Sequence, residues 1–150
     1  MKKFSFKFEA VLKQRKIREE DALRALGDAQ RAYQEEVSAK SSLLSILDRS
    51  LRRREELGGD AVPVLAFQLE EDYIRGTKQR LVRADQAILR ASKAVEKALR
   101  AYLNARKQSR TIEILREKAY EQYRREKAKL EQKRQDDLTV MRTRLNLEAM

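Results

Sequence analysis

The chain has 150 residues with a net charge of +11, and 39% of them are charged. It contains no histidine, cysteine or tryptophan, which excludes disulfides and zinc, haem and iron–sulfur sites of the usual ligand types. The chain has one proline, four glycines and a mean hydropathy of -0.77. Because its apolar residues recur at regular spacing, this composition favours a long coiled-coil protein over a disordered one.

The first predicted element is a helix from about Phe4 to Leu57. It carries a heptad seam with Leu23, Val37, Leu44 and Leu51 at position a, and Leu26, Tyr33 and Leu47 at position d. Gln30 and Lys40 interrupt this seam. Nearer the N-terminus, one face of the helix in a shifted register is predicted to hold Phe4, Phe8, Val11 and Leu12. A seam of this kind predicts that the helix packs against another helix.

A single cluster of turn residues, LGGDAVP, follows the first helix. Gly58 and Gly59 are predicted to end the helix, because glycine accepts the left-handed conformation of a helix C-cap with least strain. We therefore place a turn at 58–62 and expect Pro63 in the first turn of the next helix, where its missing N–H is harmless. A turn this short makes the two helices antiparallel neighbours.

The second helix is predicted from about Pro63 to Leu147, with Gly76 as a weak point near its start. Large residues recur at Ile74, Leu81, Ile88, Val95 and Tyr102, and small ones at Thr77, Ala84, Ala91, Ala98 and Ala105. Both sets repeat every seven residues, which marks a seam. We expect Ala84, Ala91 and Ala98 to lie against Leu51, Leu44 and Val37, so that large residues face small ones without voids.

The second predicted helix is longer than the first, so the first cannot pair with it along its whole length. With the turn near residue 60, its last stretch of about 30 residues has no partner within the hairpin. This overhang keeps an apolar face, formed by Tyr123, Leu130, Leu138, Met141 and Leu145. An isolated helix in water gains little from local interactions, so the face indicates another protein as its partner. The alternative is a fraying tail.

The positive charge is concentrated between Arg75 and Arg110. This stretch contains eleven Lys and Arg residues but only two acidic residues, Asp85 and Glu96. We interpret this stretch as a surface for acidic protein partners; nucleic acid and an anionic membrane surface are alternatives. Carboxylate runs such as Glu19–Asp21 point in different directions on a helix and do not form an acid–base pair. We therefore expect no catalytic site, no metal and no cofactor, and no segment is apolar enough to span a membrane.

Both ends of the chain carry motifs of a known family. The N-terminal FEAVLKQRKIREEDALRALGDAQ and the C-terminal LEQKRQDDL, on either side of the central Gly/Pro turn, resemble the FliJ family of bacterial flagellar export proteins. The predicted fold is all-α: one coiled-coil domain over 1–150, a long antiparallel two-helix hairpin whose second helix overhangs the first.

The resemblance implies a non-enzymatic component of the flagellar type III export apparatus, at the cytoplasmic face of the inner membrane. Such a protein is expected to act as the central stalk of a hexameric export ATPase, to contact the export gate and to cycle export chaperones. Contact with the ATPase ring would involve Tyr123, Leu130, Gln132, Lys133, Arg134, Asp136 and Leu138. Contact with the gate would involve Tyr73, Thr77, Arg80 and Ala84. The alternatives are a scaffolding coiled coil that dimerises and a basic helical protein that binds nucleic acid.

Overall fold

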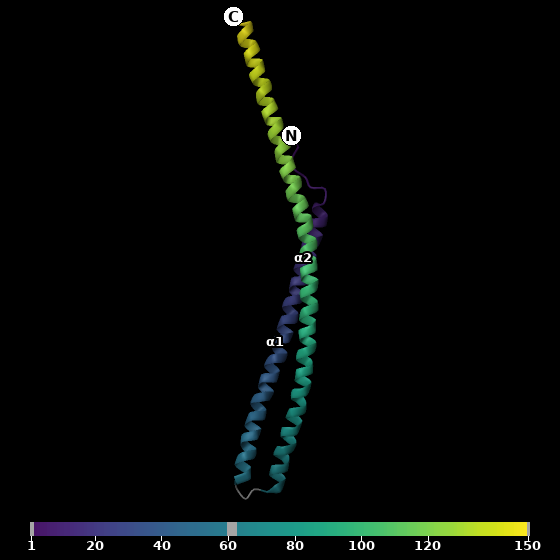
Figure 1. Ribbon diagram of the computed structural model, residues 1–150, viewed down its shortest axis with the longest axis vertical. Helices are drawn as coiled ribbons and strands as arrows, with labels where there is room; N and C mark the ends of the chain where they lie inside the picture. The colour runs from purple at the N-terminus through teal and green to yellow at the C-terminus, as the bar shows by residue number, and fades with distance from the viewer. Residues whose placement is uncertain (1, 60–62, 150) are drawn as a thin grey trace. The chain divides into compact units, whose positions relative to one another are not determined.

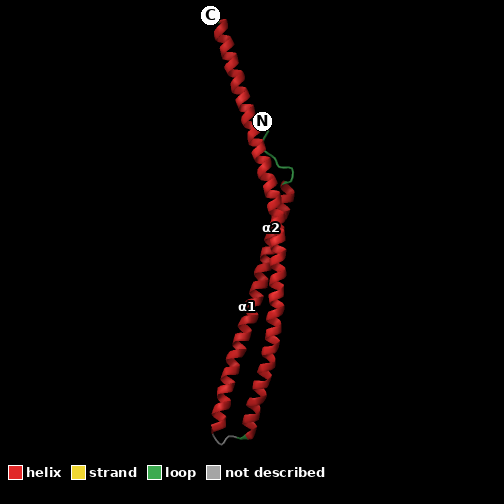
Figure 2. Ribbon diagram, in the orientation of Figure 1, coloured by secondary structure: helices red, strands yellow, loops and turns green. Residues whose placement is uncertain are grey.

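The computed structural model describes residues 2–59 and 63–149, and over these residues the chain is an all-α hairpin. Helix α1 spans Glu9–Gly59 and helix α2 spans Val64–Glu148, and the two run side by side in opposite directions (Figure 1). The described residues form no strand (Figure 2). The predicted fold class is confirmed.

Helix α1 begins later than the sequence pattern predicted. We expected a start at about Phe4, but the helix starts at Glu9, whose N–H donates to the Phe6 carbonyl at 3.3 Å. Residues 2–6 are irregular, and a turn at 7–8 leads into the helix. Phe4 packs against tyrosines of α2, as described below, and this contact is not made by continuing the helix. The predicted helical face that joined Phe4 and Phe8 to Val11 and Leu12 is therefore wrong.

The end of α1 also differs from expectation. The helix continues through Gly58 to Gly59, and none of the glycines in the described part of the chain has a positive φ. The left-handed cap predicted at these glycines is absent there, and the rest of the predicted turn, 60–62, lies outside the described residues. Pro63 directly precedes α2, and its carbonyl accepts hydrogen bonds from the N–H groups of Ala66 (3.0 Å) and Phe67 (3.5 Å).

The chain divides into two compact units, each built from parts of both helices. Unit 1 contains residues 2–19 and 104–149 of the described chain, and unit 2 contains residues 20–103. We describe the two units separately. The single domain predicted from the sequence stays a prediction.

In unit 2, the seam of α2 follows the predicted heptads. Ile74 and Thr77 are buried, and Thr77 is only 1% exposed. The remaining members of the two sets are partly buried: Leu81, Ala84, Ile88, Ala91, Val95, Ala98 and Tyr102. The alternation of large and small residues along this face of α2 is confirmed.

The predicted seam positions of α1 are only partly correct. Leu26 is buried, and Tyr33 and Leu47 are partly buried, so the d set is confirmed. Three of the four a positions are wrong, because Leu23, Val37 and Leu44 are 50%, 37% and 48% exposed, whereas Leu51 is partly buried. The less exposed positions lie one residue earlier: Ser50 is buried, and Ala22, Glu36 and Leu43 are partly buried, as is Ala29 in place of Gln30. Small and charged residues occupy the seam of α1, and this is why apolar periodicity selected the neighbouring positions.

Ion pairs in unit 2 show the register of the two helices. Lys40 Nζ lies 2.7 Å from Asp85 Oδ1, and Arg54 Nη1 lies 3.0 Å from Glu71 Oε1. The two pairs are two heptads apart on both helices, so the seams stay aligned between them.

This register corrects the predicted partners of the alanines. Ala91 lies level with Tyr33 and Ala98 level with Leu26, in place of Leu44 and Val37. Ala84 lies level with Lys40 and not with Leu51, since Lys40 pairs with the adjacent Asp85. Conversely, small residues of α1 lie level with large residues of α2, as in Ser50 with Ile74 and Ala29 with Val95. In these layers large residues thus face small ones in both directions, although not in the predicted pairs, while Leu43 lies level with Leu81.

The alanine layer at Ala91 can be tested by overpacking it. Ala91→Leu should lower the free energy of unfolding by about 1–3 kcal/mol, because the added atoms meet the layer of Tyr33. The matched change Ala94→Leu, at an exposed position one turn away, should have almost no effect. Denaturant unfolding followed by circular dichroism measures both. Equal effects of the two changes would show that Ala91 does not face α1.

A substitution at Gly76 should raise the stability of the fold instead of lowering it. A Cβ atom added at Gly76 meets no heavy atom within 4 Å, and the residue lies within α2. Gly76→Ala should therefore raise the free energy of unfolding by about 1 kcal/mol, through lower entropy of the unfolded chain and better helix propensity. Gly58→Ala, which is equally unobstructed but lies at the end of α1, should give a smaller gain in the same unfolding measurement. A loss of stability at Gly76 would contradict this account.

Candidate partner-binding surfaces

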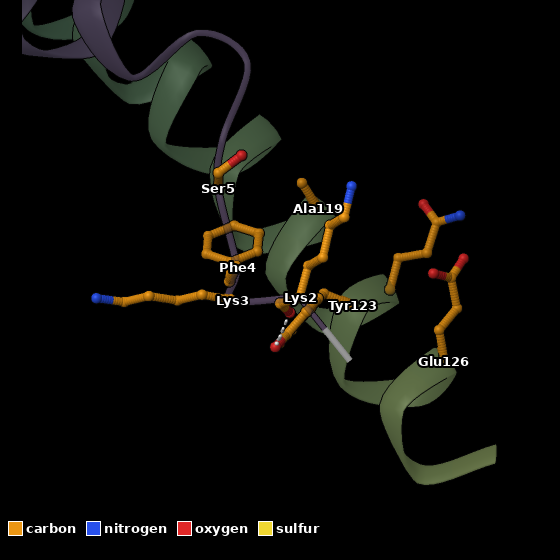
Figure 3. A pocket seen from close by; sticks show the side chains of 8 residues that line it. Lys2, Lys3, Phe4, Ser5, Ala119, Tyr123 and Glu126 are labelled. Carbon is orange, nitrogen blue, oxygen red and sulfur yellow. Dashed lines mark hydrogen bonds between the residues drawn. The ribbon is translucent and has the colours of Figure 1, made fainter. Parts of the chain in front are cut away.

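The N-terminal segment of unit 1 lies across α2 and is held there by aromatic rings. The ring centroid of Phe4 lies 5.1 Å from that of Tyr120 and 5.4 Å from that of Tyr123. The hydroxyl of Tyr123 donates a hydrogen bond of 2.8 Å to the Lys2 carbonyl (Figure 3). The guanidinium of Arg116 lies 5.8 Å from the Phe4 ring centroid, in a cation–π contact. The first residues of the chain thereby extend the pairing of unit 1 as far as Tyr123.

A shallow surface pocket lies beside this contact (Figure 3). Its lining consists of Lys2, Lys3, Phe4, Ser5, Ala119, Gln122, Tyr123 and Glu126. The described residues contain no cluster of three or more acidic side chains that could hold a metal ion. The pocket combines two basic side chains and one acidic side chain with two aromatic rings.

A small ion-pair network joins α1 and α2 within unit 1. Lys16 Nζ lies 2.8 Å from Glu113 Oε1, and Arg110 Nη1 lies 3.1 Å from Glu113 Oε2. Hydrogen bonds from Lys16 and Arg110 lower the pKa of Glu113 below its ordinary value of 4.5, and the bond to Glu113 raises the pKa of Lys16 above 10.5. A second pair, Arg116 Nε to Glu9 Oε2 at 2.9 Å, links the start of α1 to α2.

This network predicts a pH-dependent effect of Glu113→Gln. Because the folded pKa of Glu113 is lowered, its contribution exists above about pH 4.5 and is lost as the pH falls through the folded pKa. Because the pKa of Lys16 is raised, its contribution exists below about pH 10.5 and is lost as the pH rises through the folded value. At pH 7 the change should cost about 0.5 kcal/mol, since the side chain of Lys16 is 52% exposed.

Thermal melts at pH 7 and pH 3 measure this effect. The difference in melting temperature between wild type and Glu113→Gln should shrink at pH 3. Glu117→Gln is the control, because Glu117 pairs only with Arg110 among the described residues and is 65% exposed. A pH-independent difference for Glu113→Gln would contradict an electrostatic origin.

Beyond Tyr123, no other segment in the described part of the chain covers α2. Every residue from Arg124 to Glu148 is exposed. Four of its exposed apolar residues continue the face of Tyr123 at helical spacing: Leu130, Leu138, Met141 and Leu145. Thr139 and Thr143 satisfy their hydroxyls with carbonyls one turn earlier in the same helix. An exposed helix of this length that keeps an apolar stripe has the form of a partner-binding element.

The residues predicted to contact the ATPase ring fall into two environments. Six lie in the exposed end of α2: Leu130, Gln132, Lys133, Arg134, Asp136 and Leu138. Tyr123 differs, because it is partly buried and engaged by Phe4 and Lys2. Sequence reasoning missed this intramolecular partner, since it assigned Phe4 to a helix.

The residues predicted to contact the gate are also divided. Thr77 is buried in the seam and donates a hydrogen bond of 2.9 Å to the Tyr73 carbonyl, and Ala84 is a partly buried seam residue. Tyr73 and Arg80 are exposed and one heptad apart, so they lie on the same side of α2. Only these two present their side chains to a partner while the hairpin is closed.

The basic residues of α2 are mostly on its outer face. All eleven between Arg75 and Arg110 are exposed. Positions Arg83, Arg90, Lys93, Lys97, Arg100 and Lys107 recur at intervals of three, four and seven residues, opposite the seam. None of these six forms an ion pair with another residue in the described part of the chain. In 2–59 and 63–149, no helix combines the length and apolar character needed to cross a membrane.

Comparison with known proteins identifies the class. The family profile described as "Flagellar FliJ protein" matches residues 4–148. No curated protein matches the sequence. The fold is similar to a solved structure described as a putative YscO homolog, CT670, from Chlamydia trachomatis, with a TM-score of 0.55 and 20% sequence identity. That similarity covers 99% of this chain and all of the other.

A two-helix hairpin with a long exposed helical end defines the class as an all-α coiled-coil hairpin. Within that class, the chain belongs to the flagellar FliJ family, whose profile covers almost its whole length, so the resemblance of both end motifs is confirmed. It is a component of flagellar protein export.

Proposed function

We propose that the protein is the central stalk of the hexameric flagellar export ATPase, with the exposed end of α2 inserted into the ring. The observation that carries the proposal is the segment 124–148, in which every residue is exposed while an apolar stripe persists. A lone helix of this kind gains stability only when a partner covers its stripe. A ring that surrounds the helix would cover it from all sides.

The chemistry of the segment fits a stalk. The stripe from Leu130 to Leu145 occupies one side of the helix, and charges of both signs occupy the others. Subunits around a ring would therefore meet different surfaces at any moment, which lets one rigid helix affect them unequally. This role needs stiffness and an asymmetric surface, and it needs no catalytic residue of the stalk itself.

The remaining roles of the family are proposed on narrower grounds. We assign gate contact to the side of α2 that carries Tyr73 and Arg80, because both are exposed and lie in line. Cycling of export chaperones and attachment to the cytoplasmic face of the inner membrane through the export apparatus follow from the family assignment. A role as a nucleic-acid-binding or scaffolding protein has no comparable support, since the family match points to protein export.

Truncation tests the stalk role. Deletion of residues 127–150 keeps Tyr120 and Tyr123, on which Phe4 packs, and removes only exposed residues. The hairpin should therefore melt within a few degrees of the full chain, because exposed positions contribute typically about 0.5 kcal/mol or less. Stimulation of the export ATPase should be lost. Full stimulation by a folded truncated chain would refute the stalk assignment.

Point changes refine the same test with a matched control. Gln132→Ala with Lys133→Ala should lower ATPase stimulation without shifting the melting temperature. Gln79→Ala with Lys78→Ala changes the same residue types at exposed positions of unit 2 and should leave stimulation unchanged. Equal loss by both double variants would point to a general charge effect.

A further inference from the structure

One side of unit 2 carries an exposed apolar surface that neither the seam nor the proposed stalk uses. It consists of Leu23, Val37 and Leu44 on α1 and Val82, Leu89 and Leu103 on α2. Each of the six is between 37% and 58% exposed. We name this set the apolar ladder. Monomeric proteins rarely expose large apolar residues in such an ordered array without a partner.

The ladder residues lie on the same side of the hairpin. Those on α1 each follow a seam residue directly, as Leu44 follows Leu43, and Val82 and Leu89 likewise follow Leu81 and Ile88 on α2. In an antiparallel pair the positions after the seam on both helices share one side. In unit 1, the corresponding positions of Lys16 and Glu113 are joined by an ion pair, which agrees with this arrangement.

The register of the two helices places the ladder residues of α1 and α2 at matching heights, in layers. The Lys40–Asp85 pair sets Leu44 level with Val82, Val37 level with Leu89, and Leu23 level with Leu103. The layers are separated by one and two heptads, and the layer between the last two holds Gln30 and Glu96. One heptad rises about 10.5 Å, so the three layers extend over about 30 Å.

We propose that the apolar ladder docks an amphipathic helix of a partner protein that carries acidic residues along one flank. A helix with apolar residues at heptad spacing reproduces the interval between layers and would close a three-helix arrangement over the hairpin. A lipid surface requires no matched layers on two helices, so the regular spacing favours a helix. The proposal is independent of the stalk role, since it uses unit 2 and not the end of α2.

The charges at the edges of the ladder indicate which charge the partner helix carries. On α2 the outer edge of the ladder carries Lys93 and Arg100, which are exposed and form no ion pair with other described residues. The acidic Asp85 lies between the ladder and the seam and is already bound to Lys40. On α1 the edge is uncharged over Gln34, Ser38, Ser41 and Ser45. An acidic flank would therefore lie against α2 and a neutral one against α1.

The same charges argue against a second copy as the occupant. The chain has a net charge of +11, and a two-fold interface would bring the basic α2 edges of both copies to the same surface. Like charges placed together at an interface oppose association. The partner is thus a different, acidic protein.

The test uses a helix-stapled peptide of about 28 residues, long enough to span the three layers, with leucines at heptad spacing and glutamates on one flank. A second peptide replaces each glutamate by lysine. Fluorescence anisotropy at physiological salt should show that the full-length protein binds the glutamate peptide at least about tenfold more tightly. Val37→Glu with Leu89→Glu should weaken that binding by about tenfold or more.

The matched control is Ala32→Glu with Ala94→Glu. These exposed residues form a layer on the opposite side of the hairpin, so this variant should bind within about twofold of wild type. Thermal melts establish that both variants are folded. Equal affinity for the two peptides, or equal loss in both variants, overturns the proposal. It is also overturned if the ladder variant instead abolishes binding to anionic phosphatidylglycerol vesicles or abolishes self-association measured by sedimentation equilibrium.

Discussion

The packing of large against small residues along one antiparallel seam is the constraint on which the structure depends. Two helices share a single interface, so there is no second layer to correct a misfit. Tyr33 faces Ala91 and Ser50 faces Ile74, and a shift of three or four residues would place Tyr33 against Ile88 or Val95. The ion pairs of Lys40 and Arg54 add little energy because they are partly exposed to water, but they agree with this alignment.

A single seam buries few side chains, and this shapes the energetics. Polar residues are accepted in the interface where they are small or can reach water at its edge, as with Ser50, Thr77 and Lys40. Thr77 satisfies its hydroxyl within its own helix, whereas Ser109 Oγ is buried without a hydrogen-bond partner. A buried polar group without a partner lowers the free energy of unfolding, and this loss is a larger fraction of the total in a protein with a small core. The protein is therefore regular along its length and modest in burial, which suits a structural element that acts by its surface.

The surface is where the parts of the chain differ. In unit 1, the aromatic contact of Phe4 with Tyr120 and Tyr123 marks the last pairing along α2, and every residue after it is exposed. In unit 2, the two sides of the hairpin are unlike: one carries the apolar ladder, and the other carries small residues such as Ala32 and Ala94. Because few residues are used for the core, many remain available for partners. The proposed stalk and the proposed docking side use separate sets of them.

The sequence by itself determined the class of fold, the seam of α2 and the exposed end. The heptads from Ile74 to Tyr102 are clear because large and small residues alternate in every layer, whereas the neighbouring stripe of Val82, Leu89 and Leu103 is interrupted by Glu96. The excess length of α2 over α1 follows from the position of a single turn. The family could be recognised from the motifs at both ends of the chain, and the family profile matches residues 4–148.

Only the tertiary structure decided the face of α1 and the course of the first residues. On α1, the stripe that contains Leu44 is more apolar than the stripe that contains Leu43, yet the second one forms the seam, because its small residues fit the large residues of α2. Phe4 leaves the helix because tyrosines more than a hundred residues later offer aromatic packing. The buried position of Thr77 and the exposed ladder follow from the same fit. Each depends on shape complementarity between distant segments, which local periodicity does not contain.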